Sequence, residues 1–275
     1  MPTAAPAAPA LKPPLKWAGG KRWQVPYLRR LWQPNQDRRL VEPFCGGIAV
    51  TLGLSPSRAL LNDANPHLVN FYRWLQEGLQ IDLEMENDKR LFYRHRARFN
   101  ELLADGGAET REAAALFYYL NRTGYNGLCR FNKDGEFNVP FGQYGRIRYL
   151  RDFDAYRGLL ASCTFTNTDV ESVALRPDDF VYADPPYDVP FRQYARGGFS
   201  WHDQERTARR FAAHPGPVVL VNQATERIES LYRSLGYAIE FARAPRRISC
   251  TGDRAPAREI IATRNMPGEG PRSEH

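Results

Sequence analysis

The amino-acid sequence predicts an α/β protein with a doubly wound, mostly parallel sheet that is interrupted by an inserted module. Short apolar runs recur and end in polar or acidic residues, and helical patterns lie between several of them. Residues 66–150 form a connection far longer than a crossover between parallel strands needs. With 275 residues, 43% of them hydrophobic, the chain can form one large core or one core with a smaller module.

Four apolar runs have the character of buried parallel strands, because they are continuously hydrophobic and carry polar residues at their carboxyl ends. They occupy residues 40–42, 59–63, 180–184 and 218–222. Two further strands are expected near the C-terminus, at residues 237–241 and 259–263. Ligands bind at the carboxyl ends of the strands in such a sheet, so the polar residues there are candidate site residues.

The inserted stretch is expected to contain a helix followed by a hairpin. Thr110 can cap a helix that should end at Gly124. Ala113, Phe117 and Leu120 would share its apolar face. The Asn-Gly pair at residues 126–127 and the Asp-Gly pair at 134–135 are turn signals, so we expect a basic hairpin or a compact loop after the helix.

The charge balance and the termini narrow the class of protein. A net charge of +7 favours a polyanionic partner, although a merely soluble basic surface explains it equally well. The cysteines lack metal-ligand spacing, so no metal site is expected. Residues 1–14 and 266–275 are expected to be a flexible leader and tail. No stretch approaches the ~20 apolar residues that span a bilayer, so we expect a cytoplasmic protein.

A strand followed by a tight glycine turn occupies residues 42–47. Glu42 ends the strand and Phe44 precedes Gly46, where a missing side chain would let a ligand approach the backbone. Turns of this kind are equally common in structural roles. Asp63 closes the next strand, at a spacing similar to the ~20 residues between glycine turn and ribose-binding acid in dinucleotide folds. An adenosine-bearing cofactor fits this pattern, whereas the alternative for Asp63 is a helix N-cap before Asn65.

The segment 184–187 places an aspartate, two prolines and a tyrosine directly after an apolar strand. An aromatic amine is a poor nucleophile because its lone pair is delocalised into the ring, and two acceptors on its protons would favour the reactive pyramidal form. The Asp184 carboxylate and the Pro185 carbonyl can supply these acceptors, and Tyr187 can stack on an extruded base. The alternative is a strand-ending turn with a packed tyrosine.

At four separate places, in order along the chain, the sequence resembles the Dam-type (class alpha) family of S-adenosylmethionine (SAM)-dependent DNA adenine-N6 methyltransferases. The similar segments are residues 15–21, the glycine turn 42–47, the hairpin segments 121–130 and 136–142, and residues 184–187. The resemblance implies a Rossmann-like catalytic domain formed by residues 15–65 and 151–265, with a target-recognition domain at 66–150. It also implies SAM as the methyl donor, no metal, and double-stranded DNA as the partner.

The same resemblance implies roles for individual residues. Catalysis would fall to Asp184, Pro185 and Tyr187. The cofactor-binding residues would be Trp17, Lys21, Glu42, Phe44, Gly46, Asp63 and Asp184. The DNA-binding residues would be Lys16, Tyr125, Asn126, Leu128, Arg130 and Pro140. Leu128 and Pro140 could equally be packing residues of the hairpin. Arginine makes the best bidentate contact to guanine, so Arg130 is the expected base-reading residue.

Two positions depart from the family pattern. Ile48 stands where many members have another glycine, and we expect cofactor binding to survive it. Gln143 stands where some members have an arginine, which affects the recognition sequence more than the reaction; GATC is the first expectation. The basic segment 244–252 is expected either to grip a DNA phosphate or to be a solvated loop.

Two other functions remain open at the level of the sequence. An enzyme of this type could instead methylate the 4-amine of cytosine, RNA or a glutamine amide, but aspartate at position 184 and the hairpin resemblance favour adenine in DNA. A DNA-binding regulator without catalysis is the second alternative, against which the intact Asp184, Tyr187 and Lys21 argue. We expect the protein to act as a monomer, associated with the nucleoid through DNA.

Overall fold

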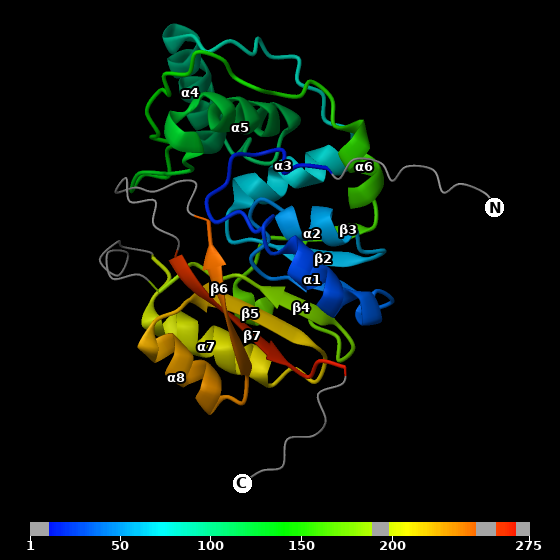
Figure 1. Ribbon diagram of the computed structural model, residues 1–275. Coiled ribbons are helices and arrows are strands. Elements are labelled where there is room, and N and C mark those ends of the chain that lie inside the picture. The colour runs from blue at the N-terminus through cyan, green and yellow to red at the C-terminus, as the bar shows by residue number, and fades with distance from the viewer. Residues whose placement is uncertain (1–10, 189–197, 246–256, 268–275) are drawn as a thin grey trace, which may run out of the picture.

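The computed structural model describes residues 11–188, 198–245 and 257–267, and these residues contain a seven-stranded sheet in the order β3-β2-β1-β4-β5-β7-β6 (Figure 1). The strands are β1 (Leu40–Glu42), β2 (Ala59–Asn62), β3 (Cys163–Thr166), β4 (Phe180–Ala183), β5 (Val218–Gln223), β6 (Ala238–Ala244) and β7 (Ala257–Arg264). Strands β1 to β5 all run parallel to one another, and β7 is antiparallel to both of its neighbours, β5 and β6. The fold is therefore the Rossmann-like α/β sheet that the resemblance implies.

The strand order reverses between β1 and β4, which are hydrogen-bonded neighbours. The crevice outside the carboxyl ends of the strands at such a switch point is where α/β sheets bind ligands. Because β7 runs in the opposite direction, its first residues lie at this same edge, and Glu259 pairs with Gln223 at the end of β5. The edge is thus formed by the ends of the parallel strands and by the beginning of β7.

All six expected strands are present, within a few residues of their expected bounds. Strand β3 was not predicted. It has four residues, lies at one edge of the sheet, and its side chains are alternately buried and more exposed. A strand this short and this polar gives no apolar run to detect.

Helices cover both faces of the sheet and form the inserted module (Figure 1). The α-helices are α1 (Val25–Trp32), α2 (Ala49–Leu54), α3 (Pro66–Gln76), α4 (Lys89–Ala104), α5 (Arg111–Thr123), α6 (Asp154–Leu160), α7 (Trp201–Ala212) and α8 (Glu226–Ser234). Short 3-10 turns are η1 (Gln33–Asn35), η2 (Tyr125–Gly127) and η3 (Val170–Ser172). Within the three described ranges, none of the helices is long and apolar enough to cross a membrane.

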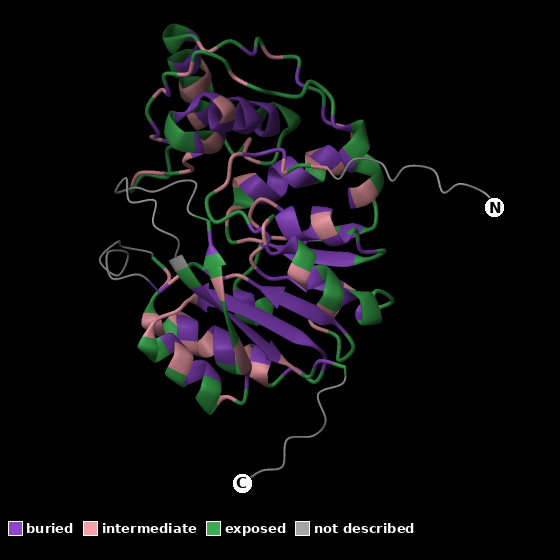
Figure 2. Cartoon of the chain, viewed as in Figure 1, coloured by how far each residue is buried: buried purple, intermediate pink, exposed green. Residues whose placement is uncertain are grey.

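Both faces of the sheet are buried at β1, β2, β4 and β5, which accounts for the continuous hydrophobicity of these strands, whereas most of β6 is exposed or half-buried (Figure 2). On β4, Phe180 and Tyr182 belong to the apolar cluster shared with α1, α2 and α3. Val181 and Ala183 belong to the cluster shared with α7 and α8 on the opposite face. The first cluster continues into the inserted module, so the module and the sheet share one core.

Helix α3 connects the sheet to the module. Tyr72 of α3 stacks on Phe165 of β3, with ring centroids 5.4 Å apart. One residue earlier, Phe71 stacks on Tyr118 of α5 at 5.7 Å. The helix therefore contacts the sheet with one aromatic residue and the module with the next, which fixes the orientation of the module over the carboxyl edge.

The predicted helix and hairpin of the module are both present. Helix α5 has Thr110 as its N-cap and Gly124 as its C-cap, as expected. In the hairpin that follows, an isolated antiparallel bridge pairs Phe131 with Phe137. Gly135 has a φ of 81° at the expected Asp-Gly turn, which favours glycine because a Cβ would be strained there.

Candidate active site

The switch point brings together residues from four strands and from the N-terminal segment. Lys21 precedes α1, Glu42 ends β1, Asp63 follows β2, Asp184 follows β4, and Glu259 lies near the start of β7. All of these residues except Glu259 are candidate site residues on the basis of the sequence.

Lys21 and Asp184 form the central ion pair of this edge. The Lys21 ammonium lies 3.1 Å from Asp184 Oδ2 and donates a hydrogen bond to the carbonyl of Gly19 at 3.0 Å. The other carboxylate oxygen, Oδ1, is buried and has no hydrogen-bond partner among the described residues. Burial raises the pKa of Asp184, and the neighbouring ammonium opposes this shift. The pair thus holds one oxygen. The other lies near the Tyr187 hydroxyl, which also lowers the pKa of Asp184, but the two atoms do not form a hydrogen bond of ordinary geometry.

Tyr187 completes this arrangement. The Lys21 ammonium lies over its ring, 4.7 Å from the centroid. Burial, together with the charges of Asp184 and Glu259, raises the pKa of the Tyr187 hydroxyl well above its usual value, so it stays protonated. The ring is partly buried and packs against the core cluster.

The segment 184–187 is held from the side of α7 and β5. Gln204 of α7 donates a hydrogen bond to the carbonyl of Pro186 at 2.7 Å. Asn222 of β5 donates to the Gln204 side chain at 2.9 Å and accepts from the backbone N–H of Asp188. Asp188 is also paired with Arg227 of α8. These contacts fix the backbone immediately after Asp184, including both prolines.

Glu259 extends the ion pair into a buried network that the sequence analysis missed. Its carboxylate lies 3.9 Å from the Lys21 ammonium and accepts a hydrogen bond from Gln24 at 3.0 Å. Gln24 in turn accepts a hydrogen bond from the hydroxyl of Tyr182 at 2.9 Å. The sequence feature that could have indicated Glu259 is its position as the acidic first residue of the expected strand 259–263, which is otherwise mainly apolar. Its importance depends on β7 being antiparallel, which the sequence alone does not show.

The glycine turn packs against Trp17. A Cβ at Gly46 would lie 3.0 Å from two atoms of the Trp17 indole, and one at Gly47 would lie 3.2 Å from the Trp17 Cβ. Gly46 also has a positive φ of 44°. Glycine is therefore favoured at position 46, and a side chain at position 47 would require Trp17 to shift by a few tenths of an ångström, apart from any ligand. Ile48, the departure from the family pattern, is fully buried and has a φ of 50°, an unusual conformation for a β-branched residue.

Asp63 links the ends of β1 and β2. Its carboxylate accepts hydrogen bonds from the backbone N–H of Gly46 at 3.0 Å and of Asn65 at 2.9 Å. The N-cap of α3 is Asn65, whose side chain accepts from the backbone N–H groups of His67 and Leu68. The alternative in which Asp63 caps this helix is therefore wrong, and its carboxylate remains at the glycine turn.

The two remaining cofactor candidates differ in their surroundings. The Glu42 carboxylate is turned inward and accepts hydrogen bonds from the backbone N–H and the hydroxyl of Thr51. Burial raises the pKa of Glu42 to about 8, an effect that the Thr51 hydrogen bonds oppose. Phe44 is partly buried and makes an edge contact with Phe199, with ring centroids 5.7 Å apart. Phe44 packs against the apolar cluster of α7 and α8, while the Glu42 carboxylate is turned toward α2.

Lys16 joins the N-terminal segment to the module. Its backbone N–H and carbonyl both pair with the side chain of Asn121 of α5, each at 2.8 Å. Its ammonium donates to the Arg122 carbonyl at 2.9 Å and lies 3.7 Å from the centroid of the Tyr144 ring. A Cβ at Gly127 would lie only 2.4 Å from the Lys16 Cβ. The expected DNA-binding lysine is therefore held against the hairpin.

The other expected DNA-binding residues lie on the hairpin. Tyr125 is 51% exposed, and its backbone N–H donates to the carbonyl of Pro140 at 2.9 Å. Asn126 and Pro140 are exposed, whereas Leu128 is partly buried and packs against the core. Arg130 is exposed, and Asn138 accepts two hydrogen bonds from its guanidinium, at 2.7 and 3.1 Å. Gln143 is exposed.

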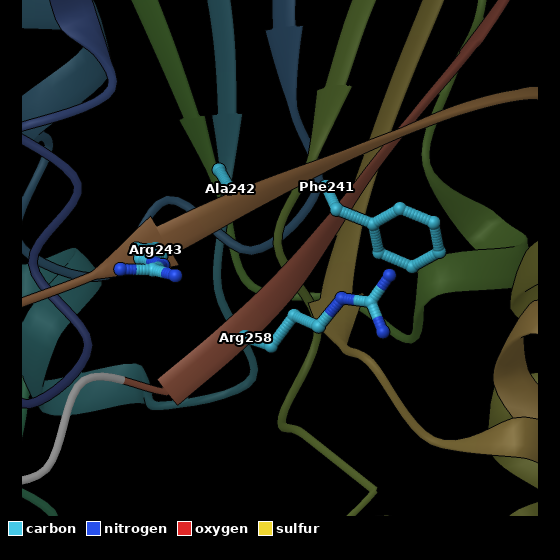
Figure 3. A pocket seen from close by; sticks show the side chains of 4 residues that line it. All are labelled: Phe241, Ala242, Arg243 and Arg258. Atoms are coloured by element: carbon cyan, nitrogen blue, oxygen red, sulfur yellow. The ribbon is translucent and has the colours of Figure 1, made fainter.

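An open pocket lies at the end of β6 and the beginning of β7, lined by Phe241, Ala242, Arg243 and Arg258 (Figure 3). Arg243 and Arg258 are direct cross-strand partners, and the Arg258 guanidinium lies 3.7 Å from the centroid of the Phe241 ring. The Arg258 side chain extends toward Phe241 and away from Arg243 (Figure 3). The expected phosphate-gripping segment 244–252 begins here, but its residues 246–252 lie outside the described residues.

No group of three or more histidine, cysteine or acidic side chains in the described ranges could hold a metal ion. The site consists of an aspartate with one oxygen outside the ion pair, an ammonium, a partly buried tyrosine and a glycine turn at the switch point of the sheet. Such an arrangement can accept hydrogen bonds from a planar amine and hold an adenosine-bearing ligand beside it.

Comparisons with known proteins identify the family. The sequence model of the D12 class N6 adenine-specific DNA methyltransferases matches residues 17–244. The chain is 34% identical to the Retron Ec67 DNA adenine methylase of Escherichia coli, over 90% of each chain. It is 34% identical to a DNA adenine methylase of Vibrio cholerae, over 86% of this chain and 90% of the relative. It is 32% identical to a type II methyltransferase of Lactococcus lactis, over 92% and 95%. The chain therefore belongs to the D12 class of adenine-specific DNA methyltransferases, of the Dam type.

Proposed function

We propose that the enzyme transfers a methyl group from SAM to the 6-amino group of an adenine that is rotated out of duplex DNA, within the sequence GATC. The observation that carries this proposal is the Asp184 carboxylate. One of its oxygens is held by Lys21, and the other is buried without a partner among the described residues, beside the Tyr187 ring. A buried acceptor without a donor costs free energy unless a ligand supplies the donor.

The residues at the carboxyl edge fit an adenosine-bearing cofactor. Asp63 lies at the end of the strand next to the glycine turn, where a ribose-binding acid is found in related sheets. The residues that would hold SAM are Trp17, Lys21, Phe44, Gly46, Asp63 and Asp184. Glu42 would act from beneath, by fixing α2 through Thr51. When bound, SAM supplies a methyl group on a positively charged sulfur, which is a good leaving group.

The chain's own residues orient and activate the amine. Asp184 Oδ1 and the Pro185 carbonyl accept hydrogen bonds from its two N–H groups, which localises the nitrogen lone pair for attack. One of these protons leaves to solvent after the methyl group is transferred. Tyr187 stacks on the base, as aromatic residues do in other enzymes that extrude a nucleotide. The contacts from Gln204 and Asn222 keep the segment in one conformation, so that the acceptors are in place before the substrate arrives.

The DNA duplex would lie between the sheet edge and the inserted module. In this proposal residues 66–150 recognise the target, residues 15–65 and 151–265 perform catalysis, and the two ends of the chain take no part. Tyr125, Asn126 and Arg130 are exposed on the hairpin, where they could reach base edges, and Leu128 and Pro140 support them. Lys16 lies between the two parts. The enzyme acts as a monomer in the cytoplasm, without a metal.

The experiment is to incubate the purified protein with SAM and an unmodified DNA duplex that contains every possible tetranucleotide. The methylated positions in the product are then read by single-molecule sequencing. Methylated adenine confined to GATC is the expected result. Methylated adenine at another sequence would overturn the recognition site, and methyl groups on cytosine would overturn the proposed target amine. DNA left unmodified despite SAM binding would overturn the proposed reaction.

A further inference from the structure

Glu259 is a buried carboxylate to which neither the motifs nor the proposed mechanism gives a role. Its side chain is 6% exposed. It pairs with Gln223 at the end of β5 and with Ala242 on β6, which places it at the carboxyl edge of the sheet. Burying a carboxylate costs free energy unless it is paired and hydrogen-bonded, so its partners indicate its purpose.

The partners of Glu259 form a closed ring of contacts with the catalytic strand. One carboxylate oxygen accepts from Gln24 at 3.0 Å, and Gln24 accepts from Tyr182 on β4 at 2.9 Å. The other oxygen lies 3.9 Å from the ammonium of Lys21, which lies 3.1 Å from Asp184, two residues after Tyr182. The N-terminal segment, β7 and the catalytic segment are thus connected through side chains that are nearly all buried.

We propose that Glu259 is a positioning residue that holds the Lys21 ammonium between two carboxylates. Lys21 then engages only one oxygen of Asp184, and the second oxygen stays available to the substrate amine. The inference rests on the role proposed above for Asp184. One ammonium cannot neutralise two carboxylates, and the excess negative charge makes Asp184 a stronger proton acceptor than it would be in a simple ion pair.

The electrostatic surroundings of Asp184 decide how this can be measured. Charged and titratable groups face it from several elements: Lys21, Glu42, Tyr182, Tyr187, Tyr232 and Glu259. Burial raises the pKa of Glu259, the Lys21 ammonium and the nearby Tyr187 hydroxyl lower it, and the charge of Asp184 raises it. Because this coupling is mutual, removing the charge at position 259 should lower the pKa of Asp184.

The first test uses the enzyme without cofactor or DNA. Glu259→Gln keeps the size of the side chain and its contact with Gln24 but removes the charge. A ¹³C NMR titration of the carboxyl groups, with Asp184→Asn to assign the signal, should show the pKa of Asp184 fall. Glu240→Gln, the same change at an exposed position on β6, should leave it unchanged. An unchanged Asp184 pKa in Glu259→Gln would overturn the proposal.

The second test separates positioning from a merely structural role. Glu259→Gln should fold normally, lower the plateau kcat by about 10- to 100-fold and move the acid limb of the kcat profile to lower pH. Glu259→Asp restores the charge and should return the limb to its wild-type position. In a Lys21→Met background, Glu259→Gln should cause no further loss of plateau kcat, because Glu259 acts through Lys21. The proposal would be overturned if the losses of plateau kcat in Lys21→Met and Glu259→Gln were additive. It would also be overturned if Glu259→Asp did not return the acid limb of the kcat profile to its wild-type position.

The failure of this inference differs from a failure of the proposed function. If Asp184→Asn retained full methyl transfer, the role of Asp184 would be wrong, whatever the titration of Glu259→Gln showed. If Asp184→Asn were inactive while Glu259→Gln left both the Asp184 pKa and kcat unchanged, only the role of Glu259 would be wrong.

Discussion

The Lys21 ammonium lies 3.1 Å from Asp184 Oδ2, while Asp184 Oδ1 is buried without a hydrogen-bond partner in the described part of the chain. Asp184→Asn keeps the shape of the side chain but replaces one acceptor by a donor. We expect kcat to fall by about 10²- to 10⁴-fold, while affinity for DNA stays near that of the wild type. Methyl incorporation and fluorescence anisotropy measure the two quantities. Asp178→Asn, at an exposed position, is the control, and a variant with near wild-type kcat would refute the mechanism.

The pH dependence of catalysis should follow the same ion pair. Asp184 must be ionised to accept a hydrogen bond from the amine at Oδ1, so kcat should be lost as the pH falls through its pKa, which burial raises above 3.8. The Lys21 ammonium opposes that shift. Lys21→Met should therefore raise the pKa further and move the acid limb of the profile to higher pH. A limb that moved to lower pH, or did not move, would contradict this assignment.

The Trp17 indole requires a glycine at position 46. An alanine Cβ there would lie 3.0 Å from two indole atoms, and the φ of 44° is strained for a residue with a side chain. Gly46→Ala should destabilise the fold by roughly 1–2 kcal/mol and weaken SAM binding, because Trp17 would be displaced. Calorimetry measures both. Gly145→Ala, where a Cβ would meet no atom within 4 Å, should change neither; equal SAM affinity in both variants would count against Trp17 as a cofactor residue.

Local signals in the sequence predicted much of the fold. Polar residues at the ends of apolar runs gave the strands around Asp63 and Asp184, because buried parallel strands leave little else polar. The helix between Thr110 and Gly124 was predictable because the residues that begin and end it are recognisable from the neighbouring sequence alone. Strand β3 was missed because an edge strand of four residues has no strong pattern.

Contacts between distant parts of the chain could not be predicted in this way. Glu259 meets Gln24 across 235 residues of sequence, and only the antiparallel direction of β7 brings them together. Asn121 holds Lys16 across 105 residues, which depends on how the module docks. The glycine turn was expected to admit a ligand, and Gly46 and Gly47 in addition accommodate Trp17. The roles of the individual site residues remain predictions that the experiments described here test.

Arg130 is the expected base-reading residue of the hairpin. Asn138 holds its guanidinium through two hydrogen bonds at 2.7 and 3.1 Å, which pre-orients the exposed side chain. Arg130→Ala should cost about 1–3 kcal/mol of discrimination between GATC and a duplex with the guanine replaced. Anisotropy titrations on the two duplexes measure this difference. Lys133→Ala, at the exposed turn of the same hairpin, should weaken binding to both equally; the same uniform loss in Arg130→Ala would indicate a phosphate contact instead.

The buried Glu42 should make the stability of the fold depend on pH. Burial raises its pKa from 4.5 to about 8, so between these values the folded chain holds a proton that the unfolded chain has released. Unfolding then releases a proton, and stability falls as the pH rises through this window, by at most about 1.4 kcal/mol per pH unit. Glu42→Gln can still accept both hydrogen bonds from Thr51 but has no such proton to lose. Urea unfolding at several pH values in the window should therefore give a flatter dependence for the variant. If wild type and Glu42→Gln lost stability in parallel, Glu42 would be ionised in the folded enzyme, and its charge would have to be balanced at the site.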